Sequence, residues 1–274
     1  MFFLNSVYMP LLYSPLYYLR HPCVCRVCLP TLVFASFVAK FRKVYSASTF
    51  KAKFEVFKAN LQKITLFNSQ KRSYKMGTNA LTDLTPAEFK KLLGLKQLDA
   101  GTSFIEGGVV VDGEAEADTE VTAEMTAGTK DWSTGLTEPR FQGYCGSCWA
   151  FSTAAFLESH HFSKTNEKIM LSEQELLDCV PRGNCVGGYF DLAAAYGVVK
   201  GLALRKDYPY EEYQKTCRSS STPRSGFKAP SKVKMLARTE AAILAGLQKS
   251  ALIIGVSGTG NLQFYSSGLI DDCT

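Results

Sequence analysis

Two cysteines three positions apart form the most distinctive feature of the sequence. Cys145 and Cys148 lie in the stretch QGYCGSCWAF, residues 142–151, where glycines frame them and a tryptophan follows the second. Cysteine pairs with this spacing occur in zinc sites, in redox couples, in disulfides and beside nucleophilic thiols. Each of these chemistries makes a different demand on the neighbouring residues.

A zinc site and a redox couple fit the surroundings of this pair less well than a nucleophile. Cys179 and Cys185 could supply a second pair, but they lie too far apart for the usual zinc knuckle and no histidine is near them. A thioredoxin-type couple follows a strand, whereas the preceding TEPRFQGY contains Pro and Gly and no apolar strand. We therefore interpret the two cysteines separately.

Cys148 opens the apolar stretch CWAFSTAAFLESHHFS, which predicts a buried helix. A thiol at a helix N-terminus faces unpaired N–H groups and the positive end of the helix dipole, which favour the thiolate. Gln142 carries a side-chain amide that a loop can fold back toward this thiol. A backbone N–H and that amide would form an oxyanion hole. The pattern favours a nucleophilic Cys148, and it leaves Cys145 free to form a disulfide.

The remaining elements are predicted mainly as helices. Residues 41–68 contain no Pro or Gly and repeat apolar side chains at helical spacing. Capping patterns predict further helices after Thr85, Ser172 and Thr239. The stretch FDLAAAYGVVKG predicts another helix that ends at Gly201, and ALIIGV, residues 251–256, predicts a strand.

Charge is distributed unevenly along a chain whose overall composition is that of a globular protein, with a net charge of +6. Residues 40–96 contain thirteen Lys and Arg against three Asp and Glu, whereas residues 98–129 contain eight acidic and no basic residues. The basic residues alternate with helical apolar positions, so we interpret them as a solvated helix face and expect no nucleic-acid partner. Residues 97–129 are predicted to be an exposed acidic linker.

The first 39 residues are mostly apolar and are interpreted as a signal peptide with an unusual extension, or as a signal anchor. Val33 and Ala35 are spaced like a cleavage site. The spacing of His21, Cys23, Cys25 and Cys28 loosely resembles that of a zinc site. We favour chance clustering, or acylation of the cysteines, over metal binding. Nine cysteines indicate an oxidising compartment, so the secretory pathway, a lysosome or vacuole, or the extracellular space is expected.

Several motifs together resemble those of papain-like, cathepsin-type cysteine proteases over residues 41–274. CGSCW matches the local signature around the nucleophile of that family. NCVGGYF, residues 184–190, resembles the GCxGG substrate loop, and LSEQELLDC and DYPYEEY match other family stretches. Two propeptide motifs of the family, ERFNIN and GxNxFxD, are matched in part. The matching residues are Phe57, Asn60, Ile64, Asn68, Gly77, Asn79 and Asp83, whereas Thr49, Lys53 and Leu81 depart from the motifs.

The resemblance implies an α+β papain-like fold and the precursor of a cysteine-type endopeptidase that forms a thioester at Cys148. The implied domains are a leader over 1–39, a helical inhibitor propeptide over 40–96, a linker with the maturation site over 97–129, and a peptidase domain over 130–274. That last domain would comprise the helical left half and the start of the right β-barrel. No metal or organic cofactor is implied. The implied partners are protein or peptide substrates and the chain's own propeptide, and a monomer is expected.

The resemblance also implies roles for individual residues. Cys148 would be the nucleophile and Gln142 an oxyanion donor. Substrate contacts would come from Trp149, Gly187, Gly188, Tyr189, Phe190 and Gly255, the first beside the nucleophile and the last three around a side-chain pocket. Disulfides would join Cys145 to Cys185 and Cys179 to Cys217.

The histidine that activates the thiol in this family has no counterpart at its usual distance of about 130–150 residues after the cysteine. His160 and His161 lie in the predicted helix of Cys148, roughly 18 Å along its axis at about 1.5 Å per residue. Cys273 resembles the family cysteine just upstream of that histidine. We therefore expect a sequence truncated before its catalytic histidine and the asparagine that orients it, and inactive as written. A non-catalytic propeptide-type inhibitor or binder of related proteases is the alternative.

Overall fold

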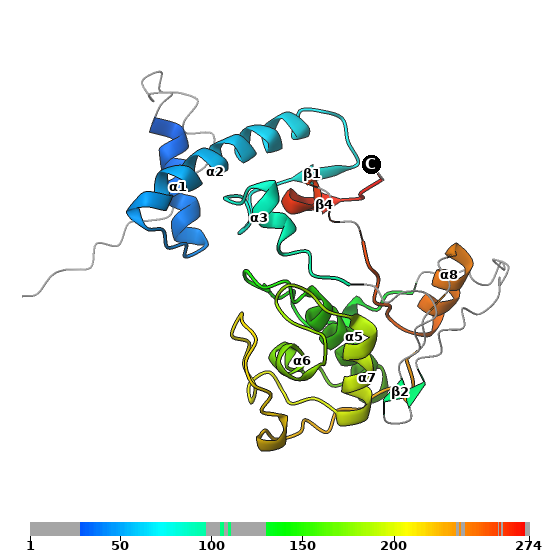
Figure 1. Ribbon diagram of the computed structural model, residues 1–274. Coiled ribbons are helices and arrows are strands. Elements are labelled where there is room, and N and C mark those ends of the chain that lie inside the picture. The colour runs from blue at the N-terminus through cyan, green and yellow to red at the C-terminus, as the bar shows by residue number, and fades with distance from the viewer. Residues whose placement is uncertain are drawn as a thin grey trace, which may run out of the picture. The chain divides into compact units, whose positions relative to one another are not determined.

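The computed structural model describes residues 28–96, 105–106, 109–110, 130–233, 236, 239–256, 258 and 260–271. The chain forms two compact units. Their segments can be found in Figure 1 from the ribbon colour, which the bar relates to the residue number. Unit 1 combines Met1–Thr85 with Thr259–Thr274, and unit 2 is Pro86–Gly258.

Two helices and an aromatic cluster build one end of unit 1. Helix α1 spans Cys28–Lys40 and helix α2 spans Ala47–Asn68. Ser46 caps the start of α2, because its hydroxyl accepts a hydrogen bond from the N–H of Thr49. Phe34 and Phe37 of α1 are buried against Phe57 of α2, with ring centroids 5.1 and 4.7 Å from that ring. Apolar burial of these rings holds the two helices together.

This packing bears on the leader expected over residues 1–39, because residues 34–39 belong to helix α1. Phe34 is 1% exposed and Phe37 4% exposed, so a cleavage after Ala35 would remove one of these two buried residues, Phe34, from the core of unit 1. An apolar secretory segment and an apolar helix face look alike in sequence, because both are short runs of large hydrophobic residues. His21, Cys23 and Cys25 lie outside the described residues.

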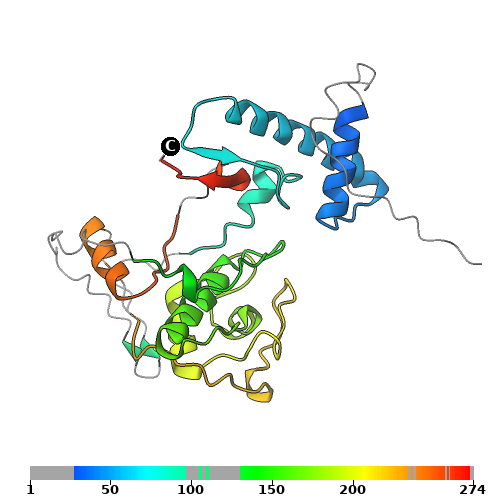
Figure 2. The same ribbon diagram turned by 180° about the vertical axis from the view of Figure 1, so that it is seen from behind.

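A two-stranded sheet brings the end of the chain into unit 1. Strand β1, Tyr74–Met76, pairs antiparallel with β4, Tyr265–Gly268, with Tyr74 opposite Gly268. Figure 2 shows the two strands side by side from behind. Phe264, which ends the short 3₁₀ helix η4 at Leu262–Phe264, is buried in the adjoining core with Ile64, Phe67, Tyr74 and Met76. Residues 260–271 thus complete the N-terminal unit.

Asparagines of α2 connect that helix to the chain that follows. The amide of Asn60 donates to the carbonyls of Thr82 and Leu84 at 2.8 and 3.0 Å. Asn68 donates to the carbonyl of Met76 at 2.7 Å and accepts from its N–H at 3.0 Å. These contacts satisfy backbone groups in residues 76–84, which contain little regular structure of their own.

The second propeptide motif is held by polar contacts as well. The carboxylate of Asp83, itself buried, accepts from the ammonium of Lys43 at 3.0 Å and from the hydroxyl of Tyr45 at 2.8 Å. The amide of Asn79 donates to the carbonyl of Gln263 at 2.8 Å. The motif residues therefore have structural roles within unit 1.

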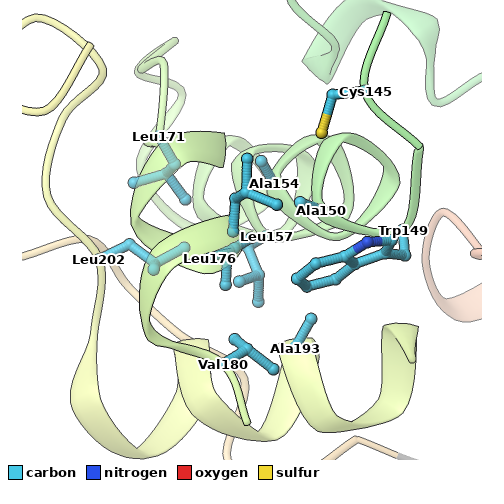
Figure 3. Close-up of a cluster of buried hydrophobic side chains, with 11 residues drawn as sticks. Cys145, Trp149, Ala150, Ala154, Leu157, Leu171, Leu176, Val180, Ala193 and Leu202 are labelled. Atoms are coloured by element: carbon cyan, nitrogen blue, oxygen red, sulfur yellow. The ribbon is translucent and has the colours of Figure 1, made fainter. Parts of the chain in front are cut away.

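Unit 2 is largely helical around a central helix. Its elements are α3 (Pro86–Lys90), η2 (Ser133–Gly135), α5 (Cys148–Thr165), α6 (Glu173–Cys179), α7 (Phe190–Lys200), η3 (Ser219–Ser221), α8 (Glu240–Lys249) and the hairpin of β2 (Ile105–Glu106) with β3 (Val109–Val110). Helix α5 packs against both α6 and α7. Figure 3 shows the core between them, with Trp149, Leu157 and Leu176 fully buried.

The expected helices of unit 2 are present, with the predicted caps at Ser172 and Thr239, whose hydroxyls accept from backbone N–H groups in the first turns. The predicted strand over residues 251–256 is absent. Ile254 and Val256 are 65% and 66% exposed, and in the described part of unit 2 no strand lies beside this run to share backbone hydrogen bonds. A β-prone sequence needs such a partner to form a strand.

Two disulfides cross-link unit 2, and they join the pairs that the resemblance implied. Cys145 bonds to Cys185 and Cys179 bonds to Cys217, with sequence separations of 40 and 38 residues. Loops of this size correspond to about 4 kcal/mol of stabilisation each if the main effect is to restrict the unfolded chain. Among the described helices, none has both the length and the hydrophobicity that a membrane crossing requires.

Candidate active site

Cys148 is the first residue of α5 and carries a half-buried free thiol. The side chain of the preceding residue, Ser147, makes no capping hydrogen bond to the helix. Within the described part of the chain, the N–H of Cys148 has no hydrogen-bond acceptor. The start of α5 therefore offers a free backbone donor next to a thiol, which is the arrangement that stabilises negative charge on an oxygen or sulfur atom.

The amide of Gln142 faces the loop that leads into this helix. Its Nε2 donates to the carbonyl of Cys145 at 2.7 Å and to the carbonyl of Leu92 at 3.2 Å. Leu92 belongs to the segment before the acidic linker, so the amide already binds a peptide carbonyl that comes from elsewhere in the chain. This is the contact expected of a donor for a peptide carbonyl oxygen.

Residues 92–96 lie beside the loop of residues 184–188, which we call the glycine loop, and bind it through main-chain atoms. The N–H of Gly188 donates to the carbonyl of Gly94 at 2.9 Å, and the N–H of Lys96 donates to the carbonyl of Gly188 at 2.9 Å. The pairing forms a parallel bridge between Leu95 and Gly188. Main-chain hydrogen bonds of this kind hold a peptide in an extended form regardless of its side chains.

Close packing explains why glycines occupy this surface. A Cβ atom on Gly188 would collide with the indole ring of Trp149, and one on Gly94 would collide with the carbonyl of Gly146. Trp149 is fully buried, so its ring cannot move aside. The same contact brings the helix start at Cys148 next to the glycine loop, because Trp149 is the following residue.

Asn184 departs from the glycine that opens the family's GCxGG loop, and it has a structural role here. Its Oδ1 accepts from the N–H groups of Val186 and Gly187 at 2.8 and 3.1 Å. This side-chain turn fixes the loop immediately before Gly188. The sequence contains a signal for it, because Asn is a common residue in such turns.

Of the three residues expected around a side-chain pocket, two lie together. Phe190 and Gly255 line the same pocket of about 1190 Å³. The side chain of Leu95 packs directly on Gly255, where a Cβ would lie 2.6 Å from Leu95 Cδ2. The ring of Tyr189 instead contacts the guanidinium of Arg182 at 4.9 Å.

Neither described histidine contacts the thiol. His161 is buried, and its Nδ1 accepts from the N–H of Lys228 at 3.0 Å. The pKa of His160 is lowered by burial, and the neighbouring Lys164 and His161 lower it further. Both lie in later turns of α5, roughly 18 Å along the helix from Cys148 at about 1.5 Å per residue.

Two residues of the stretch DYPYEEY contact the loop of Gln142, a role that the sequence alone did not indicate. The hydroxyl of Tyr210 donates to the carbonyl of Gln142 at 2.8 Å and lies 2.6 Å from the hydroxyl of Ser147. The carboxylate of Glu212 occupies the space where a Cβ of Gly143 would stand. The spacing of these residues in the sequence gives no hint of the contact, because folding creates it.

Comparison with protein families identifies both parts of the chain. Residues 126–274 match the family described as "Papain family cysteine protease". Residues 34–89 match the "Cathepsin propeptide inhibitor domain (I29)". This second match begins at Phe34, in agreement with the burial of that residue in unit 1.

Individual relatives agree with these families. Cysteine protease XCP2 of Arabidopsis thaliana is 35% identical over 252 residues, which cover 87% of this chain and 67% of that protein. Caricain of Carica papaya is 33% identical, with 80% of this chain and 62% of caricain covered. The chain thus spans about two thirds of the length of these curated relatives.

Solved precursor structures share the fold. A recombinant stem bromelain precursor aligns with a TM-score of 0.71 at 26% identity, covering 88% of this chain and 76% of that one. Digestive procathepsin L 3 of the Tenebrio molitor larval midgut aligns with a TM-score of 0.72 at 26% identity, covering 90% and 79%. The expected papain-like fold is confirmed. The chain belongs to the papain family of cysteine proteases and carries the propeptide inhibitor domain of their precursors.

Proposed function

We propose that this chain is the precursor of a cysteine endopeptidase in which Cys148 attacks the carbonyl carbon of a peptide bond. The sulfur forms a bond to that carbon, the C–N bond breaks, and the amine leaves with a proton. Water then hydrolyses the resulting thioester, which releases the acid and restores the thiol. Gln142 and the N–H of Cys148 stabilise the oxyanion of each tetrahedral intermediate.

One observation carries this proposal: residues 92–96 are already bound to the surface that includes Gln142 and Gly188, which we call the proposed groove. Residues 92–96 donate to and accept from the main chain of Gly188, and the carbonyl of Leu92 accepts from the amide of Gln142. A groove that binds a segment mainly through its backbone suits peptides of varied sequence. As long as these residues stay bound, they exclude a substrate from the same hydrogen-bonding groups.

Proton transfer sets a limit on the activity of these 274 residues. The sequence contains three histidines, His21, His160 and His161, and the two described ones do not contact Cys148. General-base catalysis contributes typically 10²–10⁴-fold. We therefore propose that this polypeptide by itself binds peptides and reacts at its thiol but hydrolyses peptides poorly.

A second candidate function is inhibition of related proteases. The match of residues 34–89 to an inhibitor domain favours it, as does the separate core of unit 1 around Phe57. In this role the chain would occupy the groove of an intact relative through the segment that follows α2. Cys148 would then be dispensable.

We also propose a cellular compartment and a division of the chain into parts. Two disulfides support an oxidising compartment, such as the secretory pathway, a lysosome or vacuole, or the extracellular space. The proposed division is a propeptide over 40–96, extended by residues 34–39, a linker over 97–129 with the maturation site, and a peptidase domain from residue 130. Protein or peptide substrates are the proposed partners, and a monomer is the proposed state.

The experiment separates binding, thiol chemistry and turnover. The full chain is cut in the linker, residues 86–96 are displaced in mild denaturant, and a peptidyl chloromethyl ketone is added, followed by mass spectrometry of Cys148. We expect labelling of Cys148 to increase at least tenfold on displacement, with little hydrolysis of a fluorogenic peptide. Unchanged labelling would refute the proposed groove, and hydrolysis that survives Cys148→Ala would refute the proposed nucleophile.

The inhibitor function is measured by adding the full chain to a related protease such as caricain. Inhibition that Cys148→Ala leaves unchanged would support the second candidate. Absence of inhibition at micromolar concentration would exclude it.

A further inference from the structure

The two expected oxyanion donors lie at opposite ends of one short loop, residues 142–148. Gln142 supplies its side-chain amide at the beginning, and Cys148 supplies its N–H at the end. An oxyanion hole works only if both donors keep a fixed separation, because hydrogen bonds to the developing charge weaken steeply with distance and angle. The loop must therefore be held at both ends.

Tyr210 contacts both ends of this loop. Its hydroxyl donates to the carbonyl of Gln142 at 2.8 Å, which fixes the direction of the second hydrogen bond, because a hydroxyl has one proton. The hydroxyl of Ser147, 2.6 Å away, must then donate to the oxygen of Tyr210. Ser147 directly precedes Cys148, so one phenol oxygen bridges the residues that carry or adjoin the two donors.

The start of α5 keeps a free backbone donor next to this bridge. Ser147 stands at the N-cap of α5, where a serine side chain usually accepts from the second or third N–H of the helix, but it makes no such bond here. The N–H of Cys148 is the first of the helix, which a cap side chain does not bind, and within the described residues nothing accepts from it.

Neighbouring contacts hold Tyr210 in place. The ring of Phe151, from the first turn of α5, meets the ring of Tyr210 edge-on, with centroids 4.8 Å apart. Two residues later, Glu212 has a φ of 66°, a strained value for a residue with a side chain. Its carboxylate packs against Gly143 within the same loop. Residues 210–212 therefore brace the loop at its start, at its second residue and at its end.

We propose that Tyr210 is a positioning residue for the oxyanion site. By bridging Gln142 and Ser147, its hydroxyl holds the amide of Gln142 and the N–H of Cys148 at a fixed separation. The proposal rests on the proposed function for the identity of the ligand, an oxyanion derived from a peptide carbonyl. It adds a residue that does not touch the substrate. Burial raises the pKa of the Tyr210 hydroxyl, which is consistent with a proton that stays in place to bind Gln142.

The test uses Tyr210→Phe, which removes the hydroxyl and keeps the ring against Phe151. Tyr196→Phe is the matched control, because this half-buried tyrosine in α7 also loses a hydrogen bond, to Glu175, away from the loop. The full chain, labelled with ¹⁵N-glutamine, reports on the side-chain amide of Gln142, whose resonance is assigned with Gln142→Ala. We expect Tyr210→Phe to shift or broaden this resonance and Tyr196→Phe to leave it unchanged.

A second readout follows the chemistry. In the nicked chain carrying Gly94→Ala, whose added Cβ would collide with Gly146 and so displace residues 92–96, the affinity for a peptide aldehyde, which forms a tetrahedral adduct with the thiol, is compared with that for the corresponding peptide alcohol. Tyr210→Phe should weaken aldehyde binding roughly 10-fold or more and leave alcohol binding unchanged, since a misplaced group can cost about 10²-fold in such geometry. Ser147→Ala should reproduce part of the effect and add little to Tyr210→Phe.

The two readouts distinguish the inference from the proposed function. If wild-type protein binds no aldehyde, the proposed function fails, whatever the resonance shows. If wild-type protein binds the aldehyde and Tyr210→Phe changes neither the Gln142 resonance nor the aldehyde-to-alcohol ratio, the positioning role of Tyr210 is refuted.

Discussion

At the scale of single residues, two buried carboxylates link the stability of unit 2 to pH. Glu158 of α5 accepts from the hydroxyl of Thr137, the N–H of Leu171 and the guanidinium of Arg140. Glu173 also pairs with Arg140. Burial raises the pKa of both carboxyls, and the charge of Arg140 opposes this without reversing it. A proton therefore binds each of them more tightly in the folded state than in the unfolded state.

The sign of the effect follows from this difference. A raised folded-state pKa adds stability that is fully present below the unfolded-state pKa and is lost as pH rises through the folded-state value. We expect the contribution of Glu158 to the free energy of unfolding to increase from pH 7 toward pH 4.5. Urea unfolding of the full chain, monitored by tryptophan fluorescence, should show a smaller gain on acidification in Glu158→Gln than in wild type.

Glu138→Gln is the control for this experiment, because the Glu138 side chain is exposed. Its pH dependence should match that of wild type. An unchanged slope in Glu158→Gln would show that this carboxyl does not couple folding to protons.

At the residue scale, the sequence could single out candidates where a residue's identity and its local contacts coincide, and their functional roles stay predictions. Gly188 must be glycine because its Cα lies on the indole of Trp149, and Gln142 must carry an amide, so both appear in recognisable motifs. The contacts of Tyr210 and Asn184 could not be predicted from the sequence, because tyrosine and asparagine occur in many structural environments. Only the folded chain shows which carbonyl or N–H group each one binds.

At the scale of elements, the segment formed by η4 and β4 stabilises the N-terminal unit. Phe264 is 1% exposed and packs with residues of α2 and β1. We expect Phe264→Ala to destabilise unit 1 by about 3–5 kcal/mol, the usual cost of removing a buried phenylalanine side chain. Hydrogen exchange of residues 60–76 should accelerate, whereas exchange in α6 and α7 should not change.

Leu269→Ala supplies the comparison for this variant, because Leu269 is 73% exposed and follows the same strand. It should behave as wild type. Equal protection of residues 60–76 in Phe264→Ala and wild type would mean that unit 1 is stable without the packing of Phe264.

Elements were predictable from sequence when their pattern was local. The helices with caps at Ser172 and Thr239 appeared as expected, because the capping residue and the apolar face lie in one window. The sequence alone could not divide residues 34–39 from the expected leader, because the buried face of α1 depends on Phe57, which lies outside that stretch. The run at 251–256 was mistaken for a strand, because strand formation depends on a pairing partner that a single segment cannot reveal.

At the scale of the whole molecule, the two halves of the sequence exchange segments. The part before the linker supplies α1, α2 and β1 to unit 1 but also α3 and residues 92–96 to unit 2. The part after the linker supplies most of unit 2 but also β4 to unit 1. Within each unit, therefore, both halves of the chain contribute to the packing.

This exchange predicts that cutting the linker will not separate the two halves. Residues 98–129 contain eight Asp and Glu and no Lys or Arg, so a glutamate-specific protease can cut there where a lysine- or arginine-specific one cannot. After the cut, each piece holds the other at two places, and two tethered contacts bind far more tightly than either alone, often by 10²–10⁴-fold. We expect the nicked pieces to co-elute in size-exclusion chromatography at neutral pH and to separate in concentrated urea.

Two variants test whether both contacts act together. Phe264→Ala weakens the contact in unit 1, and Gly94→Ala weakens the one in unit 2, because a Cβ on Gly94 would collide with the carbonyl of Gly146. Each nicked single variant should still co-elute at micromolar concentration, while the nicked double variant should elute as two pieces. Separation of the nicked wild-type pieces in native buffer would contradict this account, since both contacts are intact there and one of them would have to be too weak to retain its partner.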